Sequence, residues 1–156
     1  MDGLVLGLDL CDTYTRVSYL EDEKTWTVPT VICKKKQEDE WFIGEEAYAH
    51  VLTGTGTLVD KLVSQVQKDG TATIDGTKFE AQQLLKQFLG EVLNLPAKEY
   101  QTDVIKELVV AIRDFNMKLM EAIVICAAEL GIDKEHVHVI SHTESFVYYV
   151  LSQKRD

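Results

Sequence analysis

The sequence predicts an α/β domain with a mixed β-sheet flanked by helices. Three short and almost wholly apolar runs, at residues 4–10, 108–112 and 137–140, are typical of buried strands in a sheet. Residues 80–93 and 116–130 carry apolar side chains at helical spacing. Because the second half of the chain alternates strand, helix and strand, it predicts parallel strands joined by a right-handed helical crossover.

The first part of the chain predicts antiparallel strands. Residues 15–20 alternate between polar and apolar side chains, so they indicate a strand that forms a hairpin with the first apolar run. Residues 26–33 are rich in β-forming residues, and Pro29 within them indicates an edge or a strand start. A further strand is expected at residues 41–43, followed by a helix at residues 45–51.

The middle of the chain predicts helices around a hairpin. Residues 58–66 have apolar side chains at helical spacing, which indicates a helix. Asp75-Gly76 lies between β-rich flanks, which is a strong signal for a tight hairpin. The amphipathic helix over residues 80–93 is expected to stop at Pro96.

This order of elements predicts one lobe over residues 1–156. We expect its core in residues 1–50 and 104–156, with an inserted subdomain over about 51–103. Residues 144–153 are expected to close the lobe as a helix, and its inward side chains are Phe146, Val147, Val150 and Leu151.

Charge and cysteine content exclude several classes of protein. Sixteen basic residues against 26 acidic residues leave a formal net charge of −10, which disfavours nucleic acid and anionic membrane surfaces as partners. The three cysteines form no CxxC pair, so a zinc site is not expected. The acidic N-terminus lacks the basic region of a signal peptide, and residues 120–130 are too short to span a bilayer. These features predict a cytoplasmic protein.

Residues 7–17 carry the clearest resemblance to a known family. They read Gly-Leu-Asp-Leu-Cys-Asp-Thr-Tyr-Thr-Arg-Val, which resembles the first phosphate motif, Gly-Ile-Asp-Leu-Gly-Thr-Thr, of the actin and DnaK-like heat-shock chaperone superfamily. Pro-Thr-Val at residues 29–31, Ile-Gly-Glu-Glu-Ala at residues 43–47 and the strand at residues 109–116 resemble chaperone segments in the same order. The resemblance covers nearly the whole chain and rests on the ordered series of matches.

The resemblance implies a ribonuclease-H-like fold, specifically the first lobe of an actin-like ATPase. It implies ATP and Mg²⁺ as cofactors, the second lobe of the same protein as partner, and a chain that is the N-terminal fragment of a longer protein. The implied site residues are Asp9 for magnesium and catalysis, His142 for catalysis, and Cys11, Asp12, Thr13, Tyr14 and Lys61 for the nucleotide phosphates.

Three departures from the family pattern weaken the implied ATPase. Cys11 stands where the family has glycine, Asp12 where it has threonine, and His142 where it has the catalytic glutamate. A carboxylate facing a phosphate at ~4 Å costs about 4 kcal/mol at an effective dielectric of about 20. We therefore expect weak or no ATP hydrolysis.

Each candidate residue also has a plainer interpretation. Asp9 can cap the hairpin turn, Asp12 can accept backbone hydrogen bonds in an ordinary polar turn, and Lys61 can be a solvated surface lysine. His142 can be incidental to a helix that begins beside it. His136 and His138 suit either a metal or the solvent side of a strand, and the second is favoured.

Three functions follow in order of preference. The first is a nucleotide-binding lobe with a degenerate phosphate site, and the second is a non-enzymatic scaffold that binds protein partners through the same fold. The third is a metal-dependent nuclease of ribonuclease-H type, which would use Asp9 and needs further carboxylates; Glu144 is one candidate.

Overall fold

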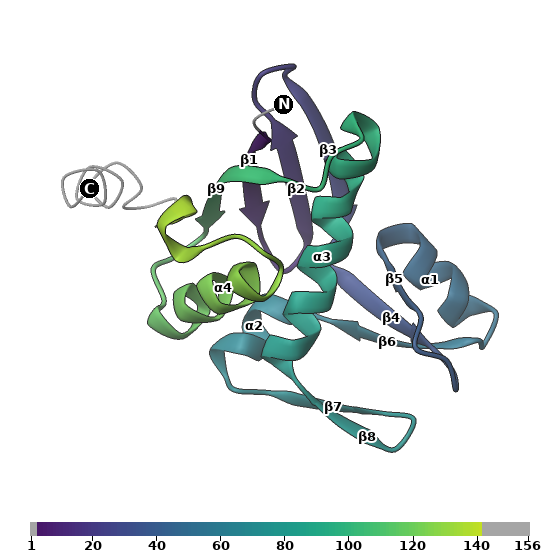
Figure 1. The fold of residues 1–156 in the computed structure, drawn as a ribbon. Coiled ribbons are helices and arrows are strands. Elements are labelled where there is room, and N and C mark those ends of the chain that lie inside the picture. Colours follow the sequence, from purple (N-terminus) through teal and green to yellow (C-terminus); the bar gives the residue numbers. More distant parts are fainter. Residues whose placement is uncertain (1–2, 142–156) are drawn as a thin grey trace.

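The computed structural model describes residues 3–141 of the 156-residue chain (Figure 1). The predicted helix at residues 144–153 and His142 lie outside the described residues. The strands are β1 (Leu4–Leu10), β2 (Tyr14–Tyr19), β3 (Lys24–Pro29), β4 (Val31–Lys35), β5 (Trp41–Ile43), β6 (Gly56–Asp60), β7 (Thr71–Ile74), β8 (Thr77–Glu80), β9 (Ile105–Ile112) and β10 (Val137–Ser141). The helices are α1 (Gly44–Leu52), α2 (Leu62–Gln67), α3 (Ala81–Tyr100), α4 (Met117–Glu129) and the 3₁₀ turn η1 (Lys134–His136).

A five-stranded mixed sheet forms the centre of the fold, with the strand order β10-β9-β1-β2-β3. β1, β2 and β3 pair antiparallel, whereas β9 and β10 run parallel to β1. The three apolar runs of the sequence are therefore neighbours in one sheet, as predicted, although β10 lies at the end of the described strand order and not at its centre. Helix α4 connects β9 to β10, as a parallel crossover requires.

One face of this sheet carries the hydrophobic core. The side chains of β1 alternate, so that Leu6, Leu8 and Leu10 lie on the core face with 2% or less of their surface exposed. Helices α2, α3 and α4 bury their apolar sides in the same cluster, and Figure 1 shows α3 running along the sheet. Asn116 accepts a hydrogen bond from the backbone N–H of Leu119 at 2.9 Å and so caps α4, as its position predicts.

Helix α3 is longer than the sequence predicts. The expectation of a helix over residues 80–93 that stops at Pro96 is wrong, because α3 continues through Pro96 to Tyr100. Proline in a helix interior costs about 3 kcal/mol, but contacts beyond it hold the last turn. The ring of Tyr100 packs on Tyr19 at 4.5 Å between centroids, and its hydroxyl donates to Asp22 at 2.7 Å.

The segment predicted as an insertion divides between the core and its periphery. Phe88 and Leu85 of α3 are fully buried in the cluster that includes β1. Among the described strands, β7 and β8 instead pair with each other alone, so the hairpin predicted from Asp75-Gly76 is confirmed. The division of the chain near residues 51 and 103 stays a prediction.

A second, three-stranded sheet has the order β5-β4-β6 and corrects one expectation. Residues 58–66 do not form one helix, because β6 pairs antiparallel with β4 before α2 begins. The β-rich residues 26–33 are divided between two strands, because buried Thr30 separates β3 from β4 and the two strands join different sheets. In both places pairing with a distant strand overrides the local pattern.

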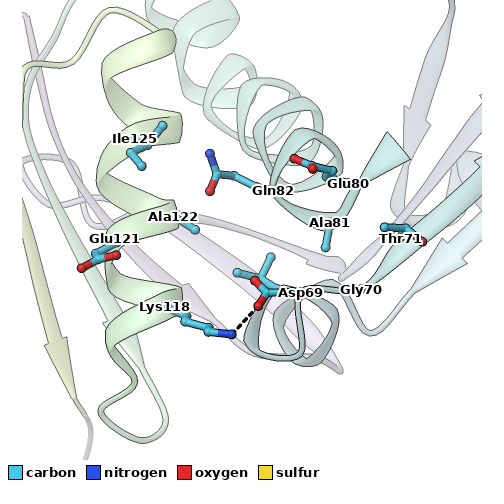
Figure 2. Close-up of a pocket in the computed structure, with 11 residues that line it drawn as sticks. Asp69, Gly70, Thr71, Glu80, Ala81, Gln82, Lys118, Glu121, Ala122 and Ile125 are labelled. Carbon is cyan, nitrogen blue, oxygen red and sulfur yellow. Dashed lines mark hydrogen bonds and ion pairs between the residues drawn. The ribbon is translucent and has the colours of Figure 1, made fainter. Parts of the chain in front are cut away.

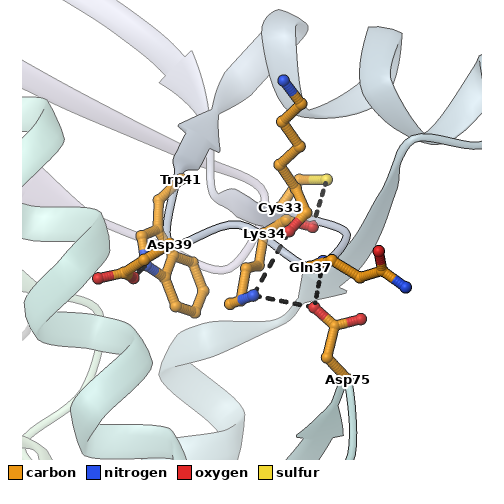
Figure 3. A network of polar contacts seen from close by, with 7 residues as sticks. Cys33, Lys34, Gln37, Asp39, Trp41 and Asp75 are labelled. Atoms are coloured by element: carbon orange, nitrogen blue, oxygen red, sulfur yellow. Dashed lines mark hydrogen bonds and ion pairs between the residues drawn. The ribbon is translucent and has the colours of Figure 1, made fainter.

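Asp75 attaches the tip of the β7–β8 hairpin to the three-stranded sheet (Figure 3). The Asp75 carboxylate accepts a hydrogen bond from Nζ of Lys34 at 2.9 Å and from the backbone N–H of Gln37 at 3.0 Å. Asp75 has a φ of 52°, the left-handed conformation that the tight turn requires. One residue thus shapes the turn and joins it to β4.

Replacing Asp75 with asparagine is expected to destabilise the protein more at neutral pH than in acid. Asparagine keeps the left-handed turn but removes the charge that pairs with Lys34. The hydrogen bond from Lys34 holds the pKa of Asp75 below its usual 3.8. The stabilisation is therefore present above the unfolded-state pKa and is lost as the pH falls through the lower folded-state pKa. Thermal melts of both proteins at pH 7 and at about pH 3 test this, and an equal difference in melting temperature at both pH values would contradict it.

Candidate functional site

A cavity of about 500 Å³ opens at the carboxyl ends of β1 and β9. Its walls are the turn between β1 and β2, one side of α2, and the two residues that follow β9, Arg113 and Asp114. Because β1 and β9 are parallel neighbours, the edge where both end is where open α/β sheets place ligands. This cavity is the candidate functional site.

Four of the predicted site residues line this cavity together. Cys11, Asp12 and Thr13 form the turn between β1 and β2, and Tyr14 begins β2. The turn is closed by a hydrogen bond from the backbone N–H of Cys11 to the carbonyl of Tyr14, at 3.1 Å. The N–H of Cys11 therefore has a partner within the turn.

Two predicted residues lie elsewhere. Asp9 is half-buried on the face of β1 opposite the core, and it does not line the cavity. The thiol of Cys11 is 3.8 Å from a carboxylate oxygen of Asp9, to which it donates. Lys61 is exposed and precedes α2 in the left-handed conformation, with a φ of 53°, so the expectation that it lies on a helix is wrong.

The carboxylate of Asp12 is bound by the first turn of α2. The backbone N–H of Ser64 donates to one carboxylate oxygen at 3.1 Å, and the hydroxyl of Ser64 donates to the other. The first N–H groups of a helix lack partners within the helix, and the helix dipole favours negative charge there. Asp12 thus joins the β1–β2 turn to α2 and supplies the anion at this point.

The charges around the cavity are mixed. Arg113 provides a cation, whereas Asp12 and Asp114 provide two carboxylates. Burial raises the pKa of the Cys11 thiol, and the neighbouring Asp9 carboxylate raises it further. Because the thiolate is the reactive form of cysteine, Cys11 is poorly suited to nucleophilic chemistry. Sequence reasoning did not single out Arg113 as a site residue, although its place directly after a buried strand was a usable signal.

A second cavity of about 420 Å³ lies between α2, the β7–β8 hairpin, the start of α3, and α4 (Figure 2). None of the predicted site residues within residues 3–141 lines it. Lys118 and Asp69 form an ion pair across it, and Glu80 takes part in the capping box of α3. Three of its charged groups are thus already engaged within the protein.

The start of β9 carries a carboxylate shared by two histidines. Nδ1 of His136 and Nε2 of His138 each lie 3.0 Å from a different oxygen of Glu107. Partial burial alone would raise the pKa of Glu107, but the hydrogen bonds from both histidines outweigh it and hold that pKa below its usual range. Within residues 3–141, no group of three or more His, Cys, Asp and Glu side chains is placed to hold a metal ion.

Replacing His136 with glutamine is expected to destabilise the protein more in weak acid than in base. The hydrogen bond to Glu107 raises the pKa of His136 above its usual 6.5. The stabilisation from the charged pair is therefore complete below the unfolded-state pKa and is lost as the pH rises through the folded-state pKa. Melting temperatures of both proteins at about pH 5.5 and about pH 9 test this. A difference that grows toward high pH would contradict the assignment.

No helix within residues 3–141 is long and apolar enough to cross a membrane.

Comparisons with known proteins place the chain in a family. A search of curated proteins found no match to the chain. The family model described as "Family of unknown function (DUF5716) C-terminal" matches residues 13–156. Because this match covers most of the 156 residues, the chain belongs to that family.

Proposed function

We propose that this domain is a lobe of the DnaK-like and actin-like nucleotide-binding type. In this proposal the turn that binds phosphate in such lobes instead holds β1 and α2 together through the hydrogen bonds between Asp12 and Ser64. In this proposal the domain hydrolyses ATP weakly or not at all. An antiparallel β1–β2–β3 unit followed by parallel β9 and β10 with a crossover helix supports this type of lobe. The cavity at the carboxyl ends of β1 and β9 lies where a nucleotide-binding lobe would hold its ligand.

The hydrogen bonds of Asp12 to Ser64 carry the proposal. They place a carboxylate of the chain itself in the turn to which the resemblance assigns the phosphates. A phosphate oxygen ~4 Å from this carboxylate would be disfavoured by about 4 kcal/mol at an effective dielectric of about 20. Asp114 adds a second negative charge, and among the described lining residues Arg113 supplies one positive charge.

The backbone of the turn supports the same conclusion. A phosphate loop binds anions through backbone N–H groups that point at the ligand, and glycine permits the close approach. Here the N–H of Cys11 donates to Tyr14 within the turn. Cys11 also places a thiol against Asp9, so the residue that the resemblance assigns to magnesium already accepts a hydrogen bond from a side chain.

A scaffold that binds protein partners is the second candidate function. The hydrogen bonds between Asp12 and Ser64 favour it. If the turn no longer serves a nucleotide, the cavity is a concave surface open to a partner's side chain. The second lobe implied by the resemblance is one such partner. ATP and Mg²⁺ are not needed for this role.

A phosphate-release assay with ATP and Mg²⁺ tests the proposal. We expect the rate with the wild-type chain to equal the rate without protein. The variant Cys11→Gly/Asp12→Thr, which carries the family's residues in the turn, serves as the comparison. Turnover by the wild-type chain at about 1 s⁻¹ or faster, within the usual range of enzymes, would overturn the proposal.

A further inference from the structure

Strand β3 lies at one edge of the five-stranded sheet (Figure 1). Its inner side pairs with β2, and within residues 3–141 no strand pairs with its outer side. An unpaired strand edge presents backbone N–H and C=O groups to which an extended segment can bind as a further strand. The outer side of β3 therefore offers backbone partners to such a segment.

The register of β3 identifies the backbone groups on its outer side. The N–H of Thr30 donates to the carbonyl of Thr13 at 3.3 Å, and this pair continues the register of β2 and β3. In an antiparallel pair, residues that exchange hydrogen bonds alternate with residues that do not. Counting back from Thr30, the intervening residues Pro29, Thr27 and Thr25 therefore direct their backbone groups outward. Proline suits this side of an edge strand, because its missing N–H removes no hydrogen bond from the sheet.

A cavity of about 380 Å³ adjoins the outer side of β3, and we call it the edge cavity. Residues 27–29 of β3 form one wall, and β5, the first turn of α1 and the second half of α3 form the others. Among the described residues, none lines both this cavity and the candidate functional site at the ends of β1 and β9. Space for side chains thus lies directly beside the backbone groups that would bind a further strand.

The edge cavity has apolar walls. Val28, Trp41, Ile43 and Leu95 line it, and all four are half-buried. The first three also pack against the margin of the main core, which holds these walls in place. The cavity can therefore accept the hydrocarbon part of a long side chain.

An excess of negative charge surrounds these apolar walls. Glu45 and Glu46 of α1 and Glu91 of α3 line the cavity with exposed carboxylates, whereas Lys98 supplies one cation. None of the hydrogen bonds and ion pairs formed within residues 3–141 involves these three carboxylates. They are therefore available to a cationic group that enters the cavity.

Arginine has the chemistry that matches this cavity. Its guanidinium binds carboxylates through several planar donors, while its hydrocarbon stem packs against apolar surface. The formal net charge of −10 also favours the approach of a basic partner. A second copy of the chain matches poorly, because pairing two β3 edges would bring the same carboxylates of both copies together.

We propose that β3 binds an extended, arginine-bearing segment of a protein partner as an additional strand of the main sheet. The outward backbone groups of Thr25 and Thr27 bind the main chain of the segment. Alternate arginine side chains enter the edge cavity, where Glu45, Glu46 and Glu91 bind them. This interaction needs neither nucleotide nor the turn at residues 11–14.

Fluorescence anisotropy with the full chain and a labelled seven-residue peptide of alternating arginine and threonine tests this proposal. The matched peptide has the same side chains and charge, but it is N-methylated at every internal residue and so lacks backbone donors. We expect saturable binding of the first peptide and at least about tenfold weaker binding of the second, because hydrogen bonds of the main chain are lost. Amide hydrogen exchange should slow at Thr25 and Thr27 on binding, and it should stay unchanged in β10, the other edge strand.

Two pairs of variants locate the contact on the protein. Glu45→Gln/Glu91→Gln should weaken binding at least about tenfold, whereas Glu121→Gln/Glu129→Gln, which changes the charge equally at exposed positions of α4, should stay within about twofold. Thr27→Pro removes one outward N–H and should weaken binding, whereas Thr27→Ala keeps that N–H and should not. Circular dichroism melts establish that each variant is folded, and the pair of peptides tests the strand addition without any change to the protein.

Three results would overturn the proposal. Absence of binding up to about 1 mM of the first peptide would exclude this partner chemistry. Equal binding of the two peptides, or equal losses in the two double glutamine variants, would leave only long-range attraction between opposite charges. Exchange at Thr25 and Thr27 that is slow without peptide and becomes fast on dilution, together with a dimer in size-exclusion chromatography, would assign the edge to a second copy of the chain.

Discussion

Truncating Phe88 to alanine is expected to lower the free energy of unfolding by about 3–5 kcal/mol, the usual cost for a buried aromatic side chain. Phe88 has no exposed surface and lies in the cluster that α3 shares with β1. For a domain of this size, each kcal/mol corresponds to about 2–4 °C in melting temperature, so we expect a decrease of roughly 10 °C. Urea unfolding followed by circular dichroism measures the effect.

The matched control is Leu52→Ala, because Leu52 ends α1 with 86% of its surface exposed. Its effect should stay within about 0.5 kcal/mol. If Phe88→Ala costs less than about 1 kcal/mol, or gives two separate transitions, α3 does not share one cooperative core with the sheet.

Replacing Asp12 with alanine is expected to lower the free energy of unfolding by about 2 kcal/mol, since hydrogen bonds to a charged group contribute about 1.5–3 kcal/mol. The change removes the acceptor for both donors of Ser64 and leaves the first turn of α2 without its carboxylate. Urea unfolding of Asp12→Ala, Ser64→Ala and the double variant isolates the interaction between the two residues.

The control for this cycle is Asp114→Ala, which removes a different carboxylate from the same cavity. Asp114 is exposed, so we expect little change in stability. A coupling energy between Asp12 and Ser64 of at least about 1 kcal/mol supports a structural role for Asp12, in which it holds the β1–β2 turn against α2. A coupling near zero would mean that the carboxylate is free to serve another purpose.

Local signals predicted the parts of the fold that local physics determines. Asp75-Gly76 requires left-handed backbone, and Asn116 supplies an oxygen to an N–H three residues later, so both were recognisable from a few neighbouring residues. Residues 58–66 were misassigned because β6 takes its hydrogen-bond partners from β4, more than 20 residues earlier in the chain. The end of α3 was misplaced because Tyr100 is held by Tyr19 and Asp22, which precede it by about 80 residues.

The candidate site divides in the same way. The turn at residues 11–14 was predictable because a polar break follows an apolar strand at the edge where ligands bind. The partner of Asp12 was not predictable, because Ser64 is 52 residues away and becomes adjacent only when α2 packs beside the turn. Lys61 was misassigned for a related reason: its left-handed backbone ends β6 and turns the chain into α2.

Isothermal titration calorimetry of the wild-type chain with ATP and Mg²⁺ tests the central claim most directly. If the carboxylate of Asp12 occupies the place of the phosphates, the titration should give no saturable heat up to about 1 mM ATP, which corresponds to a binding free energy weaker than about −4 kcal/mol. A dissociation constant in the low micromolar range, about −8 kcal/mol, would contradict the claim and show that the turn still binds nucleotide.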